Sequence, residues 1–246
     1  MRTATTRRVA PSYDPIAPFY DAWSVSVTED VEFYVEEALA AGGPVVELAV
    51  GTGRIAVPIA KAGIPVIGID LSVGMLERAR TYARAEGVEP LLDLRVGDMR
   101  EPPVDERASL VTIPFRSVLH LDSDAERLRA LKAAASLLAP GGRLVFDVFA
   151  PSAEDVEETH GRWLEREPGI FERADWDVAG QTLELSVRSG EGSASFSLHW
   201  LDAQGWRSLL REAGLKVCAL YGWFDRSPYE DDEDMIWVCE AARAAS

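Results

Sequence analysis

The sequence contains only two cysteines, Cys218 and Cys239, and three histidines. Both cysteines fall in apolar segments with strand-like patterns, so we interpret them as small buried apolar residues in a reducing compartment. No group of cysteines and histidines has the spacing of zinc ligands, and we therefore expect no bound metal.

Positive charge is scarce as well. The 246 residues include 25 Lys and Arg against 41 Asp and Glu, which gives a formal net charge of −16. Such a surface repels phosphate backbones, so nucleic acid is excluded as a partner. An apolar run of about 20 residues is absent, so we expect no membrane span. The N-terminus lacks the apolar core of a secretion signal, which predicts a cytoplasmic protein with a disordered lead at 1–12.

The most informative segment is VVELAVGTGRIAVPIA at 45–60, which predicts a strand, a turn and a helix. Gly51 and Gly53 let the turn bring its backbone close to a ligand. A second apolar strand follows and ends in Asp70, whose carboxylate can accept both hydroxyls of a ribose. Residues 51–56 also fit the dinucleotide fingerprint G-x-G-x-x-G/A, so this pattern alone leaves two classes of cofactor open.

Three further features narrow the choice of cofactor. Glu47 lies in the first predicted strand, four residues before Gly51. Residues 97–100, GDMR, follow a third predicted strand, and 138–142, LAPGG, predict a turn before the fifth. Together these motifs resemble those of the class I S-adenosylmethionine-dependent methyltransferases, and the resemblance covers about 13–239. It implies S-adenosyl-L-methionine as the cofactor.

The resemblance also implies which residues hold the cofactor. In that family an E-x-G-x-G-x-G loop wraps the methionine part, the acid that ends strand two binds the ribose, and the acid after strand three reads the adenine amino group. Ala49 stands where the first glycine of the loop often stands, which is a mild departure. The implied cofactor-binding residues are Tyr20, Glu47, Ala49, Gly51, Thr52, Gly53, Arg54, Asp70, Leu71, Met75, Asp98, Met99 and Phe115.

Some of these assignments have a structural alternative. Residues 13–23, YDPIAPFYDAW, resemble a segment that lies over the cofactor in many small-molecule methyltransferases. Tyr20 either contacts the cofactor or substrate from this segment or only packs on the fold. Phe115 either packs along the cofactor or belongs to the core. Arg54 and Arg100 either bind an anionic group of the cofactor or substrate or form ion pairs.

His120 is the candidate catalytic residue. It lies in the loop 113–121 after the fourth predicted strand, and in the resembled family this loop lines the site beside the transferred methyl. In the similar amino-sugar N-methyltransferases a histidine at this position contacts the acceptor, so His120 would act as a base or orient the acceptor. The alternative is a histidine satisfied by backbone groups. We expect His160 and His199 to be simply exposed.

Strands that alternate with helices predict an α/β fold with a Rossmann-like, seven-stranded, mostly parallel sheet. Ligands then bind outside the carboxyl ends of the strands. The resemblance implies that the last two strands form a reversed hairpin. Beyond the first strand we expect strands at 65–69, 91–96, 109–114, 143–149, 215–223 and 235–241, with helices at 54–61, 72–85 and 122–138.

The region 151–201 has a different pattern. Residues 151–160 are acidic and predict turns, whereas 182–188 and 195–201 alternate apolar and polar residues, and 170–178 is a third strand candidate. We predict one methyltransferase domain over 13–246, with 151–201 as an antiparallel β-rich insertion. This insertion would cover the methyl acceptor or pair with another subunit.

The sequence therefore predicts an S-adenosylmethionine-dependent methyltransferase that transfers a methyl group to a nitrogen or oxygen of a small-molecule metabolite or natural product. Two alternatives remain open. An NAD-dependent oxidoreductase would need a further parallel βαβ half. A non-catalytic S-adenosylmethionine-binding protein would keep the cofactor loop and lack an acceptor pocket. The expected partner is a small-molecule methyl acceptor, and a homodimer is left open.

Overall fold

A computed structural model describes residues 13–25, 28–231 and 233–242, so the lead predicted at 1–12 lies outside the described residues. Seven strands form the main sheet: β1 (Val45–Leu48), β2 (Val66–Asp70), β3 (Leu92–Val96), β4 (Ala108–Ile113), β5 (Leu138–Phe149), β10 (Leu215–Tyr221) and β11 (Asp234–Ala241). Their spatial order is β10-β11-β5-β4-β1-β2-β3.

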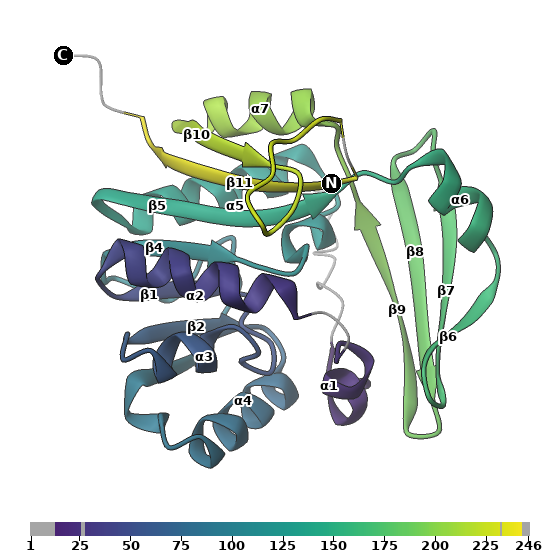
Figure 1. The fold of residues 1–246 in the computed structure, drawn as a ribbon, viewed down its shortest axis with the longest axis horizontal. Coiled ribbons are helices and arrows are strands. Elements are labelled where there is room, and N and C mark those ends of the chain that lie inside the picture. Colours follow the sequence, from purple (N-terminus) through teal and green to yellow (C-terminus); the bar gives the residue numbers. More distant parts are fainter. Residues whose placement is uncertain (1–12, 26–27, 232, 243–246) are drawn as a thin grey trace, which may run out of the picture.

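The strands β1 to β5 are parallel, as the sequence predicted. Helices lie against the sheet: α2 (Glu29–Ala41), α3 (Ala56–Lys61), α4 (Val73–Ala85), α5 (Asp124–Leu137) and α7 (Ala203–Glu212) (Figure 1). All four residues of β1 are buried, which explains why this strand reads as a short apolar run. The side chains of Ser72 and Ser123 accept hydrogen bonds from backbone N–H groups in the first turns of α4 and α5.

The last two strands reverse direction. β11 pairs antiparallel with both β5 and β10 and lies between them, which confirms the predicted hairpin. The predicted turn at 138–142 is wrong in one respect. These residues belong to β5, where Leu138 pairs with Ala108 and Arg143 pairs with Leu110. The residues between them bulge out of the ladder, with Gly141 at φ 78°, because β4 has only one residue to oppose four.

A second, antiparallel sheet follows β5. Its strands are β6 (Trp163–Glu167), β7 (Ile170–Asp177), β8 (Thr182–Ser189) and β9 (Gly192–His199), paired in that order. The sequence predicted three of these strands and missed β6, whose residues do not alternate apolar with polar. The turns predicted at 151–160 are also wrong in part, because α6 (Ala153–Thr159) lies there. Ser152 caps α6, and two acids in its first turn favour its N-terminus.

The segment before α2 lies between the two sheets. It forms the short helices η1 (Ala17–Phe19) and α1 (Tyr20–Trp23), and Figure 1 shows α1 between α4 and β9. Ile16, Phe19 and Tyr20 share an apolar cluster with Met75 of α4 and with residues of the second sheet. This packing ties the segment to both halves of the molecule.

The two cysteines differ in burial. Cys239 on β11 is buried, but Cys218 is exposed, so the prediction that both are buried is wrong for Cys218. β10 is the edge strand, and Cys218 lies at a register irregularity between Val217 and Ala219, where it is not covered. Among the described helices none is long and apolar enough to cross a membrane.

Candidate functional site

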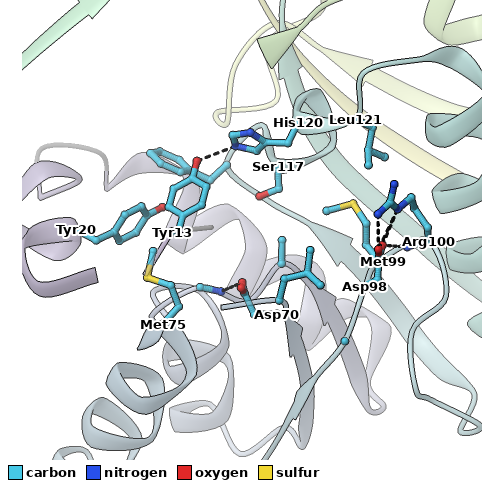
Figure 2. Close-up of a pocket in the computed structure, with 15 residues that line it drawn as sticks. Tyr13, Tyr20, Asp70, Met75, Asp98, Met99, Arg100, Ser117, His120 and Leu121 are labelled. Carbon is cyan, nitrogen blue, oxygen red and sulfur yellow. Dashed lines mark hydrogen bonds and ion pairs between the residues drawn. The ribbon is translucent and has the colours of Figure 1, made fainter. Parts of the chain in front are cut away.

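A cavity opens at the carboxyl ends of β1, β2, β3 and β4, where a doubly wound sheet places its ligands. It encloses about 740 Å³, part of which is open to solvent. Figure 2 shows Tyr13 and His120 facing each other, with Asp70 below them and Asp98 beside Arg100 at the right. The lining residues are Tyr13, Tyr20, Ala49, Gly51, Asp70, Leu71, Met75, Gly97, Asp98, Met99, Arg100, Phe115, Ser117, His120 and Leu121.

The loop after β1 has a left-handed backbone at three positions. The φ angles are 61° at Ala49, 56° at Gly51 and 81° at Gly53. Ala49 therefore takes a conformation that glycine adopts most readily. A Cβ on Gly51 would meet no atom within 4 Å, so its role is to expose backbone along the cavity wall. A Cβ on Gly53 would lie 3.2 Å from Val57 Cγ2, so this glycine serves the packing of the loop on α3.

Asp70 ends β2 and faces the cavity. Its Oδ2 accepts a hydrogen bond from the backbone N–H of Gly51 at 2.8 Å, and its Oδ1 accepts one from Ser72 at 2.8 Å. Burial raises the pKa of Asp70, against the lowering effect of these backbone bonds. A carboxylate has about four acceptor positions, so Asp70 retains the capacity to accept ribose hydroxyls.

Asp98 and Arg100 form an ion pair on the cavity wall. Asp98 Oδ2 lies 2.5 Å from Arg100 Nη2, and Oδ1 accepts from the Arg100 backbone N–H at 2.9 Å. Arg100 also pairs with Glu126 of α5. Desolvation favours a higher pKa for Asp98, but the bonds from Arg100 outweigh it and hold the pKa below its ordinary value. Arg100 was expected either to bind an anionic group or to form an ion pair, and the structure shows the ion pair.

Arg54 is likewise paired. Its Nη1 and Nη2 donate to the two carboxylate oxygens of Asp30 on α2 at 2.7 and 2.5 Å. Its guanidinium carbon also lies 4.6 Å from the ring centroid of Phe115. Arg54 lines a smaller cavity of about 300 Å³ together with Glu47 and Thr52. The residues that this cavity shares with the larger one are Tyr20, Ala49, Gly51, Phe115 and Ser117.

Glu47 is a buried carboxyl group on the wall of the smaller cavity. Only 1% of the residue is exposed, and its Oε2 has no hydrogen-bond partner in the described part of the chain. Burial raises the pKa of Glu47 to about 8, and the nearby Asp30 and Asp70 add to this while Arg54 opposes it. An unpaired acceptor of this kind fits a ligand that brings its own cationic group, such as the amino group of a methionine moiety.

His120 ends the short helix η3 (Ser117–His120) after β4. Its Nε2 lies 2.7 Å from the hydroxyl oxygen of Tyr13, and its buried Nδ1 has no partner among the described residues. Tyr13 stacks on Phe196 of β9 with ring centroids 4.3 Å apart. Desolvation, with a smaller contribution from His199, lowers the pKa of His120 to about 4, so the imidazole is neutral near pH 7.

The structure brings together most of the predicted site residues. Those that line the larger cavity are His120 and, from the predicted cofactor set, Tyr20, Ala49, Gly51, Asp70, Leu71, Met75, Asp98, Met99 and Phe115. Glu47, Thr52 and Arg54 line the smaller cavity, whereas Gly53 lines neither. His160 is exposed as expected, but His199 is half-buried and lies 3.4 Å from the Thr182 hydroxyl.

Four lining residues were absent from the prediction: Tyr13, Gly97, Ser117 and Leu121. Each lies within a segment that the sequence did single out. Tyr13 begins the 13–23 segment, Gly97 directly precedes Asp98, and the other two belong to the 113–121 loop. The motifs therefore indicated the segments that line the cavity. Which side chains of these segments face the cavity could be seen only in the fold.

Comparisons with known proteins agree with this geometry. A family model described as "Methyltransferase domain" matches residues 45–142. A demethylmenaquinone methyltransferase of Renibacterium salmoninarum is 29% identical over 208 residues, which are 80% of this chain and 83% of the relative. The cypemycin N-terminal methyltransferase of a Streptomyces species is 28% identical over 216 residues, covering 81% of this chain and 83% of the relative.

Solved structures show the same fold. The CcbJ methyltransferase from Streptomyces caelestis superposes with a TM-score of 0.82 and 27% identity, covering 94% of this chain and 97% of that one. CalS10 from Micromonospora echinaspora, an amino pentose methyltransferase with S-adenosylmethionine bound, gives a TM-score of 0.66 at 20% identity, over 92% and 97% of the two chains. The strand order, the family match and these relatives together show an S-adenosylmethionine-dependent methyltransferase with a Rossmann-like methyltransferase fold and S-adenosylmethionine as its cofactor.

Proposed function

We propose that this methyltransferase acts on a nitrogen or oxygen atom of a small-molecule metabolite or natural product, and that His120 contacts the acceptor. The observation that carries the proposal is the position of His120, which lines the cavity beside Tyr13 with Nδ1 unpaired among the described residues. The names of two similar proteins, an N-terminal methyltransferase and an amino pentose methyltransferase, are in keeping with a nitrogen acceptor.

The residues around the two cavities divide into roles that fit the cofactor. Asp70 would accept the ribose hydroxyls, and Leu71, Asp98 and Met99 would hold the adenine. Glu47 and the loop after β1 would hold the methionine part. When bound, S-adenosylmethionine supplies an already activated methyl group, so the protein's own contribution is binding, orientation and exclusion of water.

His120 is suited to orienting an acceptor more than to removing its proton. A base is most effective when its pKa lies near the operating pH, and the pKa of His120 is about 4. Its imidazole can still accept or donate a hydrogen bond, and Tyr13 restricts its ring orientation from one side. An amine that arrives neutral needs only such orientation, so this geometry favours an amine over an alcohol acceptor.

The oxidoreductase alternative is not favoured. It requires a further parallel βαβ half after β5, whereas the chain continues into an antiparallel sheet and a reversed hairpin. We propose further that the second sheet shapes the choice of acceptor. Its contact with the site runs through Phe196, which packs against Tyr13 and His120.

Methyl transfer from labelled S-adenosylmethionine to a panel of small amines and alcohols tests the proposal. We expect turnover with at least one amine and a loss of that turnover in His120→Asn. Thermal unfolding with S-adenosylhomocysteine and with NAD is the parallel control, and only S-adenosylhomocysteine should raise the melting temperature. If turnover were confined to a macromolecular acceptor, or were unchanged in His120→Asn, the proposal would be wrong.

A further inference from the structure

Phe115 and Arg116, which directly follow β4, both have a left-handed backbone with φ angles of 56° and 60°. Neither residue is glycine, asparagine or aspartate, the types that adopt this conformation most readily. Two such residues in succession persist only where the surrounding structure holds them, and such strain gathers at functional sites. Phe115 lines both the larger and the smaller cavity, so the strained pair lies at the site itself.

A single buried carboxylate accepts hydrogen bonds from the backbone N–H groups of both residues. Asp147 on β5 is 4% exposed, and its Oδ1 accepts a hydrogen bond from the Phe115 backbone N–H at 2.8 Å. Its Oδ2 accepts from the Arg116 backbone N–H at 3.0 Å. The two oxygens thus bind consecutive amides, which is the pattern expected of a group that fixes the turn rather than of one that merely fills space.

Helix α2 supports this arrangement from one face. The Tyr34 hydroxyl donates to Asp147 Oδ1 at 2.6 Å. Asp30 lies one helical turn earlier, on the same face as Tyr34. It holds Arg54, whose guanidinium lies over the Phe115 ring. The Phe115 ring also makes a T-shaped contact with Tyr20, with centroids 6.5 Å apart.

We propose that Asp147 is a positioning residue for methyl transfer. By fixing the left-handed Phe115–Arg116 turn, Asp147 holds the Phe115 ring in contact with Arg54 and Tyr20 as a wall of the cofactor cavity. Tyr34 orients the carboxylate for this task. The carboxylate does not touch the cavity, since Asp147 is not among its lining residues, and it acts through Phe115.

The substitution Asp147→Asn separates this role from simple filling of the core. Asparagine has nearly the same shape, but one of its two positions is an NH₂ donor that would face a backbone N–H. One of the two backbone N–H groups of the turn then loses its acceptor, and the left-handed conformation is no longer stabilised by both hydrogen bonds. We expect the affinity for S-adenosylhomocysteine, measured by calorimetry on the full chain, to fall about tenfold or more. Thr112→Val is the matched control, because Thr112 is buried on β4 and its hydroxyl oxygen has no partner in the described part of the chain. The affinity of this variant should equal that of the parent.

A rescue experiment tests the mechanism. Arg116→Gly and Arg116→Ala remove the same side chain, but only glycine adopts φ near 60° without strain. In the Asp147→Asn background, Arg116→Gly should recover most of the lost affinity, whereas Arg116→Ala should recover little. Equal recovery by the two variants would overturn the proposal.

Tyr34→Phe provides a milder test that keeps the buried ring in place. It removes the hydroxyl that donates to Asp147, and we expect the affinity for S-adenosylhomocysteine to fall about two- to fivefold. Chemical denaturation of each variant establishes that it is folded during the titration. Folded Asp147→Asn and Tyr34→Phe proteins with parental affinity would show that Asp147 serves stability alone and would refute the proposal. Because this ligand needs no methyl acceptor, the outcome is independent of the role proposed for His120.

Discussion

The parallel half of the main sheet and the second sheet contribute to the cavity in different ways. The loops after β1, β2 and β3 present backbone and carboxylates directly, as Gly51, Asp70 and Asp98 show. None of the described residues that line the cavity belongs to β6–β9, and the second sheet reaches the site through Phe196 and its stacking on Tyr13. In the proposed function, the groups at strand ends bind the cofactor, and the aromatic packing of the second sheet acts on the acceptor side.

The largest effect should come from the parallel half. Asp70→Ala removes a charged acceptor, and each lost bond to a charged group is worth about 1.5–3 kcal/mol. We expect S-adenosylhomocysteine to bind on the order of 100-fold more weakly by calorimetry. Asp93→Ala is the control, since that acid pairs with Arg95 on the exposed side of β3. Unchanged affinity in Asp70→Ala would place the cofactor elsewhere.

His120→Asn should separate the two sides of the cavity. We expect kcat to fall about 10- to 100-fold, within the range for positioned groups, while the affinity for S-adenosylhomocysteine stays near the parental value. Because the pKa of His120 is about 4, the rate should show no ionisation of this residue between pH 6 and pH 8. Single-turnover kinetics measure the rate of methyl transfer and its dependence on pH. A rate that rises with a pKa near ~6.5 would contradict a desolvated imidazole.

Glu47 is a buried carboxyl group whose ionisation lowers the stability of the folded chain. Its pKa is about 8 in the folded chain against an ordinary value of 4.5, so folding takes up a proton between these pH values. The stability that the protonated form contributes is present below pH 4.5 and is lost as the pH rises to about 8. Glu47→Gln should therefore raise the free energy of unfolding by about 1–3 kcal/mol at pH 8 and by little near pH 4.5. Denaturant unfolding across this range measures the difference, and equal gains at both pH values would exclude the carboxyl as their source.

The smallest effect should come from the second sheet. Phe196→Leu keeps an apolar side chain but removes the stacking on Tyr13, and such aromatic pairs are worth about 0.5–1.5 kcal/mol. We expect the KM for an acceptor to rise about two- to tenfold while the affinity for S-adenosylhomocysteine changes less than about threefold. Steady-state kinetics and calorimetry provide the two values. A larger loss of cofactor affinity than of acceptor affinity would contradict the proposal that the main sheet binds the cofactor and the second sheet acts on the acceptor side.

Much of the fold follows from local pattern. The apolar runs of β1 and β2 and the helices expected at 72–85 and 122–138 agree with the prediction, and the reversed hairpin agrees with what the resemblance implied. The errors arise where neighbours decide the outcome. Whether Cys218 is buried depends on β10 being an edge strand, and the bulge in β5 depends on its register with β4.

The cofactor class could be inferred from the sequence, because Gly51, Asp70 and Asp98 each lie within a few residues of the strand that positions them. Local spacing is sufficient to place such groups at the carboxyl ends of parallel strands. The rest of the site depends on contacts between segments that are distant in the sequence. Tyr13 meets His120 across 107 residues, and Tyr34 meets Asp147 across 113. Contacts of this separation depend on which segments the sheet topology brings together, and short-range spacing carries no signal for them.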